Sequence, residues 1–484
     1  MSSDWPKVKL VDYCDKIGSG ATPRGGSKVY LDSGEVSLVR SQNVYNHGFD
    51  YDGLVYIDDE AAEKLSNVEL KENDVLINIT GDSVARVCMV PDDVLPARVN
   101  QHVSILRPKY GSLDPRFLRY SLVNYENQYK LLAIASAGGT RKAITKGHLE
   151  DFEISLPDLD YQNEVSEILS TFDQKIHLNQ QTNETLEAMA QAIFKSWFVD
   201  FDPVLAKIEA KSGGRDPNRA AMAAISACTK VSADGAVLWD ETEAALDQKL
   251  SNMTEEQRQQ LIRTAQLFPD ELVESEIGEV PKGWGVKQAQ ELVDIGIGKT
   301  PPRKEQHWFS EDAKDVKWVS IKDMGTYGVY ALNTSEYLTR EAIEEKNVRV
   351  VPDNTVILSF KLTVGRTAIT VGEMTTNEAI AHFKLDESPD LTTKYIFLYL
   401  SQFDFESLGS TSSIAKAINS KIIKKMPILV PDKELVDSFA LQVDPIFGKI
   451  KSNSLEVRTL SQLRDTLLPK LISGEISINK TNQI

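Results

Sequence analysis

The chain has 484 residues, of which 41% are hydrophobic and 26% are charged, which excludes a disordered chain and predicts two to four domains of roughly 150 residues each. Its 54 Lys and Arg against 71 Asp and Glu give a net charge of -17, so the chain is not a uniformly basic nucleic-acid binder, although residues 201–280 alone hold fifteen of the acids and only eight of the bases. No apolar run approaches the roughly 18 to 20 residues that cross a bilayer, and the opening MSSDWPKVKL lacks the apolar core of a signal peptide, so we expect a cytoplasmic protein.

Residues 1–160 have the pattern of a mixed α+β domain. The stretch DVLINITGDSVARVCMV at 74–90 is rich in β-branched residues and is interrupted by a turn with glycine, which predicts a strand, a loop and a second strand. DPRFLRYSL at 114–122 has the pattern of a helix start. The loop GSGATPR at 18–24 lacks the third glycine of a dinucleotide-binding fingerprint.

The end of this domain is a basic loop. ASAGGTRKAITKGH at 135–148 carries three basic residues and no acid, and Thr145 is a good N-cap for a short helix. Lys and Arg beside exposed backbone N–H groups at a helix N-terminus are suited to phosphates and base edges. The competing interpretation is a solvated loop with incidental lysines.

Residues 161–204 are expected to form a long spacer helix. Apolar positions recur at alternating spacings of 4 and 3 from Val165 to Trp197, which is the seam of a coiled coil. The alternative is a core helix of an ordinary helical domain.

The segment that follows, 205–274, is acidic and contains two helical stretches, the second with a possible capping box from Thr254 to Gln257. Packing or solubility is the simplest role for this insert, and a contact with a partner protein is the other.

The second half of the chain repeats the first. Residues 275–433 contain GIGKTPPR at 296–303, DNTVILSFKLTVGRTAITV at 353–371 and TTKYIFLYL at 392–400, which match the loop, the strand pair and the helix start of the first domain. The acid-free segment 409–425 carries four lysines and contains KAI at 416–418, the motif that the first domain has at 142–144, and Asn419 takes the place of Thr145. Both segments are therefore α+β domains.

A second spacer helix is expected over 434–476, in the same heptad register as the first. Pro445 and Gly448 predict a kink in its first turns or a later start. Asn179 and Asn453 occupy equivalent central positions, where a polar pair fixes register but suits parallel and antiparallel pairing equally. The seam residues are Phe172, Ile176, Asn179, Leu186, Ile446, Ile450, Asn453 and Leu460.

No catalytic constellation stands out. The chain has no NPPY or DPPY methyltransferase motif, no GxxxxGK[ST] phosphate loop and no Ser/His/Asp cluster among its six histidines. Cys14, Cys88 and Cys228 lie far apart without metal-ligand spacing, so we expect neither a structural zinc nor a disulfide framework. Any chemistry is expected to come from another chain.

The whole chain except roughly 205–270 resembles the DNA-specificity subunit of type I restriction-modification enzymes. The most specific pieces are FKSWFVDFDPV at 194–204, SEIGEVPKGW at 275–284, the two GxTP loops and LLPKLISGEI at 467–476. The resemblance implies two target-recognition domains joined by two helices that pack as an antiparallel coiled coil. It also implies a non-catalytic protein that recognises a two-part DNA target.

The partners that the resemblance implies are two adenine methyltransferase subunits and the restriction-translocase subunits. S-adenosylmethionine, ATP and Mg are then expected on those partners, with no cofactor on this chain. Two alternatives stay open: a coiled-coil scaffold with two protein-binding domains and no DNA affinity, and an enzyme whose motif is not recognised. The candidate DNA-binding residues are Thr22, Arg24, Arg40, Arg86, Arg141, Lys142, Lys146, Lys299, Thr300, Arg303, Lys322, Lys361, Arg366, Lys416 and Lys421.

Overall fold

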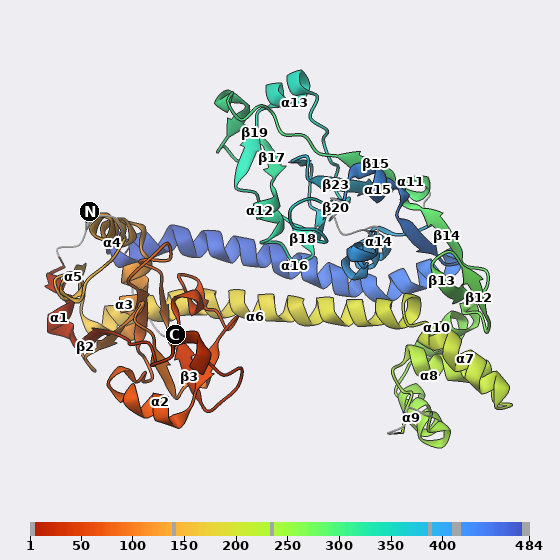
Figure 1. Ribbon diagram of the computed structural model, residues 1–484, viewed down its shortest axis with the longest axis horizontal. Coiled ribbons are helices and arrows are strands. Elements are labelled where there is room, and N and C mark those ends of the chain that lie inside the picture. The colour runs from red at the N-terminus through yellow and green to blue at the C-terminus, as the bar shows by residue number, and fades with distance from the viewer. Residues whose placement is uncertain (1–4, 138–141, 233–236, 386–389, 409–417, 477–484) are drawn as a thin grey trace, which may run out of the picture. The chain divides into compact units, whose positions relative to one another are not determined.

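The computed structural model describes residues 5–137, 142–232, 237–385, 390–408 and 418–476 (Figure 1). The chain divides into two compact units, residues 1–178 with 456–484, and residues 179–455. Each unit holds one α+β domain and one part of each of two 40-residue helices, α6 (Leu159–Phe198) and α16 (Lys433–Ile472).

The α+β domain of the first unit is built on a four-stranded sheet in the order β2-β10-β7-β8. Val75 and Ile77 of β7 face a core that includes Phe117, whereas Leu76 between them faces a second core against the sheet β6-β3-β9. The strand is buried on both faces, which explains its continuous apolar run. The elements are β1 (Lys7–Lys9), α1 (Leu10–Tyr13), β2 (Cys14–Ser19), β3 (Val36–Val39), β6 (Val55–Ile57), α2 (Asp59–Lys64), β7 (Val75–Asn78), β8 (Val87–Met89), β9 (Ala97–Val99), β10 (Val103–Pro108), α3 (Pro115–Val123), α4 (Tyr125–Ser136), α5 (Lys146–Glu150) and β11 (Glu153–Ser155).

The domain of the second unit repeats this plan, which confirms the expected internal repeat. Its main sheet has the order β15-β23-β20-β21-β18, its second sheet β16-β19-β17-β22, and the two-stranded pair β14-β24 matches β1-β11 of the first unit. The elements are β14 (Gly285–Gln288), α11 (Ala289–Leu292), β15 (Asp294–Ile297), β16 (Phe309–Ser310), β17 (Val316–Val319), α12 (Ile321–Met324), β18 (Tyr330–Ala331), β19 (Glu336–Leu338), α13 (Arg340–Lys346), β20 (Val356–Ser359), β21 (Thr367–Thr370), β22 (Thr375–Thr376), β23 (Ile380–Lys384), α14 (Thr393–Gln402), α15 (Ser420–Lys425) and β24 (Pro427–Val430).

The local predictions for these domains are confirmed. The segments 74–90 and 353–371 form the antiparallel strand pairs β7–β8 and β20–β21. The helices α3 and α14 begin where expected, because Asp114 and Thr392 accept N-cap hydrogen bonds from backbone N–H groups of the first turn.

The two long helices pack antiparallel within each unit, as expected. In the first unit Tyr161 Oη donates to the carbonyl oxygen of Leu471 at 3.1 Å, and Arg464 bonds Asp173 at 2.8 Å. In the second unit Asn453 bonds Asn183 at 3.0 Å, and the rings of Phe194 and Phe439 are 5.8 Å apart. Partners on α16 come earlier in the chain as residues on α6 come later, so the helices run in opposite directions.

The helix ends differ from the expected bounds. The helix α6 ends at Phe198, short of residue 204, because Phe201 adopts a left-handed backbone with φ 56° and a new helix follows it. The expected delayed start of α16 is wrong. The helix begins at Lys433 and runs through Pro445 and Gly448, which lie exposed while Val443 and Phe447 beside them pack into the core.

The insert folds into α7 (Asp202–Ser212), α8 (Pro217–Ile225), α9 (Trp239–Ser251), α10 (Glu255–Leu267) and the hairpin β12–β13 (Leu272–Ser275 and Gly278–Pro281). The predicted capping box at Thr254 and Gln257 is confirmed. Phe268 packs its ring 5.2 Å from that of Trp197, and Thr264 bonds Ser438 of α16 at 2.6 Å. The insert therefore covers the apolar end of the second unit's helix pair.

Candidate nucleic-acid interface

The two GxTP loops are held by the same close backbone approach. A Cβ on Gly20 would overlap the carbonyl oxygens of Val99 and Asn100, and a Cβ on Gly298 would overlap that of Asn377. The N–H of Gly20 donates to Val103 O at 3.0 Å, and that of Gly298 donates to Ile380 O at 3.1 Å. Only glycine fits at these points, which is the physical reason why both copies keep it.

A pair of asparagines fixes the neighbouring turn in each domain. The side chain of Asn100 accepts from the N–H of His102 at 3.0 Å, and that of Asn377 accepts from the N–H of Ala379 at 3.0 Å. The N–H groups of Asn100 and Asn377 also donate to Val39 O and Val319 O, each at 3.0 Å. Neither asparagine was predicted as a site residue, although VNQHVSIL at 99–106 and TNEAIAHFKL at 376–385 are matching stretches of the repeat and each contains one of them.

Arg86 and Arg366 occupy equivalent positions in the two domains. Each follows a residue with a left-handed backbone, Ala85 (φ 70°) and Gly365 (φ 93°), whose N–H donates back to the end of the preceding strand at 2.8 and 3.0 Å. The same turn therefore presents one arginine from each domain. The guanidinium of Arg86 lies 4.3 Å from the ring of Tyr45, and the exposed Arg366 contacts Ile321 O at 3.4 Å.

In the first domain Arg86 borders a hollow of about 440 Å³. Its other walls include Gln42, Thr80, Ser83 and His102, and Thr80 Oγ1 is 2.6 Å from a ring nitrogen of His102. The exposed Lys142 lies beside it, because the N–H of Gly81 donates to Lys142 O at 3.2 Å. The structure thus places Arg86 in the lining of a polar hollow, with the backbone of Lys142 bonded to Gly81, which also lines it.

The other predicted residues of the first domain have separate places. Thr22 is half-buried and Arg24 is exposed in the GxTP loop. Arg40 is used within the fold, since it donates to Gly53 O and lies 5.3 Å from the ring of Tyr30. Lys146 forms an exposed ion pair with Glu150 at 3.3 Å.

In the second domain three predicted residues are engaged with other groups of the chain. Arg303 makes a two-pronged ion pair with Glu336 at 2.7 and 2.9 Å and lies over the rings of Phe309 and Trp318. The hydrogen bonds that Arg303 donates to Glu336 raise the pKa of Arg303 further above its usual value. Lys299 donates to Lys346 O, and Thr300 donates to the carboxylate of Glu378.

The remaining cations of the second domain, Lys322, Lys361 and Arg366, are exposed. Lys361 and Arg366 flank one loop, and Arg366 reaches the carbonyl group of the residue before Lys322. These three are brought close together, whereas Arg303 is tied to an acid.

The basic loops end in capped helices. Thr145 accepts from the N–H of His148 at 3.2 Å, and Asn419 accepts from those of Lys421 and Ile422 at 2.9 and 3.2 Å, which confirms both predicted N-caps. The caps use N–H groups that a phosphate would need, so exposed lysine side chains such as those of Lys142 and Lys421 are the groups left to contact one. Lys421 is exposed, while Arg141 and Lys416 lie outside the described residues.

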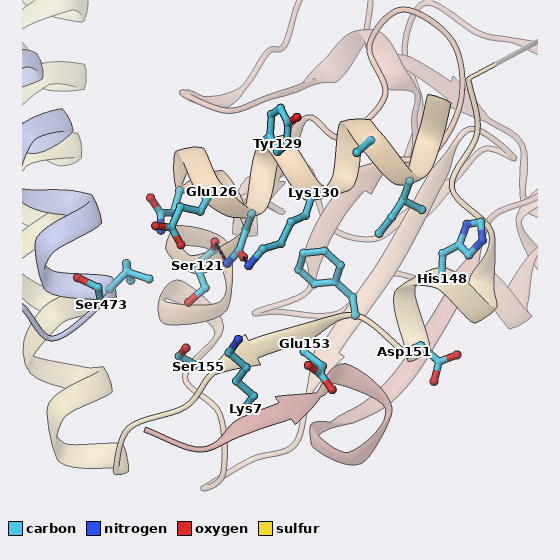
Figure 2. Close-up of a pocket in the computed structure, with 16 residues that line it drawn as sticks. Lys7, Ser121, Glu126, Tyr129, Lys130, His148, Asp151, Glu153, Ser155 and Ser473 are labelled. Carbon is cyan, nitrogen blue, oxygen red and sulfur yellow. Dashed lines mark hydrogen bonds between the residues drawn. The ribbon is translucent and has the colours of Figure 1, made fainter. Parts of the chain in front are cut away.

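A larger cavity of about 640 Å³ in the first unit is a different kind of site. Figure 2 shows Lys7, Lys130, Glu126 and Glu153 around it, from α4 and the strands β1 and β11. None of the predicted DNA-binding residues lines it. The mixed acids and bases disfavour a phosphate ligand.

The second unit has a smaller counterpart of about 310 Å³. Leu429 of β24 lines it where Ser155 of β11 lines the first cavity, and Val280 of the insert hairpin adds an apolar wall. The two cavities share a position in the repeat and differ in lining, whereas the arginine-bearing turns are common to both domains.

Among the residues that the structure describes, no group of three or more His, Cys, Asp and Glu side chains could hold a metal ion. In the same ranges, no helix is long and apolar enough to cross a membrane.

Comparison with known proteins points to one family. A model described as the type I restriction modification DNA specificity domain matches residues 2–188 and 281–438. The type I restriction enzyme HindI specificity subunit of Haemophilus influenzae is 29% identical over 98% of this chain and 100% of its own length. The MjaIX specificity subunit of Methanocaldococcus jannaschii is 23% identical over 99% of this chain and 94% of its own. The type I restriction-modification S subunit from M. genitalium shares the fold, with a TM-score of 0.51 and 14% identity over 97% of this chain and 96% of that one.

Proposed function

Because this chain belongs to the type I restriction modification DNA specificity family, whose domain model matches it twice, we propose that each α+β domain recognises one half of a two-part DNA target. The observation that carries this proposal is that the two domains share the same backbone loops and turns but differ in the side chains around them. Gly20 and Gly298 hold the same loop, and Arg86 and Arg366 project from the same turn. The side chains around each arginine differ, so two unlike half-sites are expected.

We further propose that the chain has no catalytic activity of its own and acts by positioning partners. The helices α6 and α16 hold the domains and bind two adenine methyltransferase subunits, and restriction-translocase subunits join in the full enzyme. S-adenosylmethionine, ATP and Mg belong to those partners, in the cytoplasm. No membrane is involved.

The roles of the cations follow from their surroundings. Exposed Lys142, Lys361 and Lys421 are suited to phosphates, which position a protein on the duplex but carry little sequence information. Arg86 and Arg366 stand on fixed turns and can form two hydrogen bonds with one guanine. Arg303 is assigned to folding, because Glu336 already occupies its guanidinium.

A domain exchange tests the proposal. Replacing residues 281–430 by the equivalent domain of a related subunit moves both strands of the β14–β24 pair together, so the exchanged piece keeps its own closing contact. The expected result is a methylated motif with one new half and one unchanged half, measured by sequencing methylated adenines. A motif in which both halves change, or one contiguous motif, would contradict two independent domains.

A further inference from the structure

The loop between β20 and β21 carries an exposed leucine, Leu362. Leu362 is 93% exposed, the largest exposed fraction of any leucine in the described part of the chain. Its backbone is left-handed, with φ 64°, a conformation that favours glycine or asparagine over a branched side chain. Both features disfavour leucine at this position, so folding alone does not explain it.

The turn that carries Leu362 is fixed by three hydrogen bonds within the loop. The N–H of Thr363 donates to Lys361 O at 2.8 Å, which closes a three-residue turn with Leu362 at its centre. The hydroxyl of Ser359 donates to Thr363 O at 2.5 Å and accepts from the N–H of Arg366 at 3.1 Å. The leucine side chain is therefore presented outward by a fixed loop.

The first domain provides an internal control. Its corresponding loop has Gly81 at the tip, with φ 79°, and continues with the exposed Asp82. That loop closes on the same strand pair without an apolar tip. The fold of the repeat does not require Leu362, so its side chain serves something outside the chain.

The surroundings of Leu362 indicate what it contacts. Between residues 354 and 372 the chain carries Lys361 and Arg366 and no Asp or Glu, in a chain of net charge -17. Exposed cations on both sides of an apolar tip match a DNA groove, where phosphates flank the base edges. The apolar group on a base edge is the 5-methyl of thymine.

We propose that Leu362 is a specificity-determining residue of the second domain, and that its side chain packs against the 5-methyl group of a thymine in that domain's half-site. This inference rests on the proposed function. It also gives the two domains different recognition surfaces, a polar hollow beside Arg86 and an apolar tip beside Arg366.

The test uses the full chain with its cognate methyltransferase and a duplex that carries the methylated motif. Leu362→Gly removes the side chain and suits the left-handed backbone, so its melting temperature should equal or exceed that of the wild type. Its affinity for the target should fall about fivefold or more. Replacing thymines by uracil, one at a time in the second half-site, should weaken wild-type binding at one position and leave Leu362→Gly binding unchanged there.

Leu362→Met is the matched control, since it keeps an apolar contact and should keep the discrimination against uracil at that position. Wild-type affinity in Leu362→Gly, or uracil effects that are equal in both proteins at every position, would overturn the inference. A different result would contradict the proposed function itself, namely equal binding of the wild-type complex to target and scrambled duplexes. That result would also remove the basis of this inference.

Discussion

Asn453 of α16 donates a hydrogen bond from Nδ2 to Oδ1 of Asn183 of α6 at 3.0 Å, and Nδ2 of Asn183 is 3.1 Å from Ser454 Oγ. Asn453 is 1% exposed, so this amide pair lies inside the seam. In a different helix register the buried Nδ2 group of Asn453 would lose this acceptor. Burying an unpaired donor costs free energy, which favours the observed register. The equivalent position to Asn453 in the repeat is Asn179, but antiparallel packing pairs Asn453 with the residue one turn further along α6.

The seam should not tolerate a charge. Ile450 lies one turn before Asn453 and is 1% exposed, so Ile450→Asp would bury an unpaired carboxylate and lower the free energy of unfolding by several kcal/mol. Thermal melts and co-purification with the methyltransferase would measure this. Gln180→Asp, on an exposed position of α6, is the control and should leave both nearly unchanged.

Stability should depend on Asp173 at low pH. Burial alone would raise the pKa of Asp173, but the charge of Arg119 and hydrogen bonds from Arg464 and Tyr120 outweigh it and hold the pKa below its usual range. The carboxylate therefore stabilises the folded chain above about pH 4, and this contribution is lost as pH falls through the lowered folded-state pKa.

Asp173→Asn should remove that contribution at neutral pH and cost about 3 to 5 kcal/mol, because Arg119 and Arg464 keep their charges in a half-buried site. Unfolding by denaturant at pH 7 and at pH 3 measures the difference between variant and wild type, which should shrink at pH 3. Glu167→Gln, which breaks an exposed pair on the same helix, should cost no more than about 1 kcal/mol at either pH.

A buried histidine adds a second pH dependence. Burial lowers the pKa of His382 to about 3, and its ring nitrogen is 2.6 Å from Thr376 Oγ1. The unfolded chain takes up a proton near pH 6.5 whereas the folded chain does not, so stability is lost as pH falls from about 6.5 toward 3.

The expected slope from this one group is at most about 1.4 kcal/mol per pH unit. His382→Gln should flatten the slope between pH 6 and 4 in calorimetric melts. Equal slopes in the wild type and His382→Gln would refute a neutral buried imidazole.

The free and the engaged arginines should behave differently toward DNA. Arg86→Ala and Arg366→Ala should weaken target binding and relax discrimination at the guanine that each is proposed to read, with little change in the log-log salt slope. Arg303→Ala should instead lower the melting temperature, since it leaves Glu336 unpaired, and should keep the salt slope. A salt titration of the double variants Arg141→Ala with Lys142→Ala, and Lys416→Ala with Lys421→Ala, tests the basic loops, because each lost phosphate contact lowers the log-log salt slope by about 0.9. Unchanged slopes in both double variants would reject the phosphate contacts of the basic loops, and unchanged base preference in Arg86→Ala and Arg366→Ala would reject their role in base recognition.

The sequence by itself determined the repeat, the two long helices, the strand pairs and the N-caps at Thr145 and Asn419. These features depend on periodicity and on residues close together in the chain, which a linear pattern records. The expected late start of the second helix, read from Pro445 and Gly448, was wrong because a linear pattern records only local preferences, and the packing of Val443 and Phe447 into the core outweighs them.

Only the tertiary structure decided the direction of helix pairing and the state of each candidate cation. Central asparagines fit either direction, and the antiparallel choice depends on partners such as Asp173 and Arg464, which are far apart in sequence. The sequence predicted the same DNA-binding role for Arg303 and Arg366. In the folded chain Glu336 forms an ion pair with Arg303, whereas Arg366 is exposed in the loop that carries Leu362. A side chain becomes available to a ligand only when no other part of the folded chain has already bound it, and that depends on contacts between distant residues.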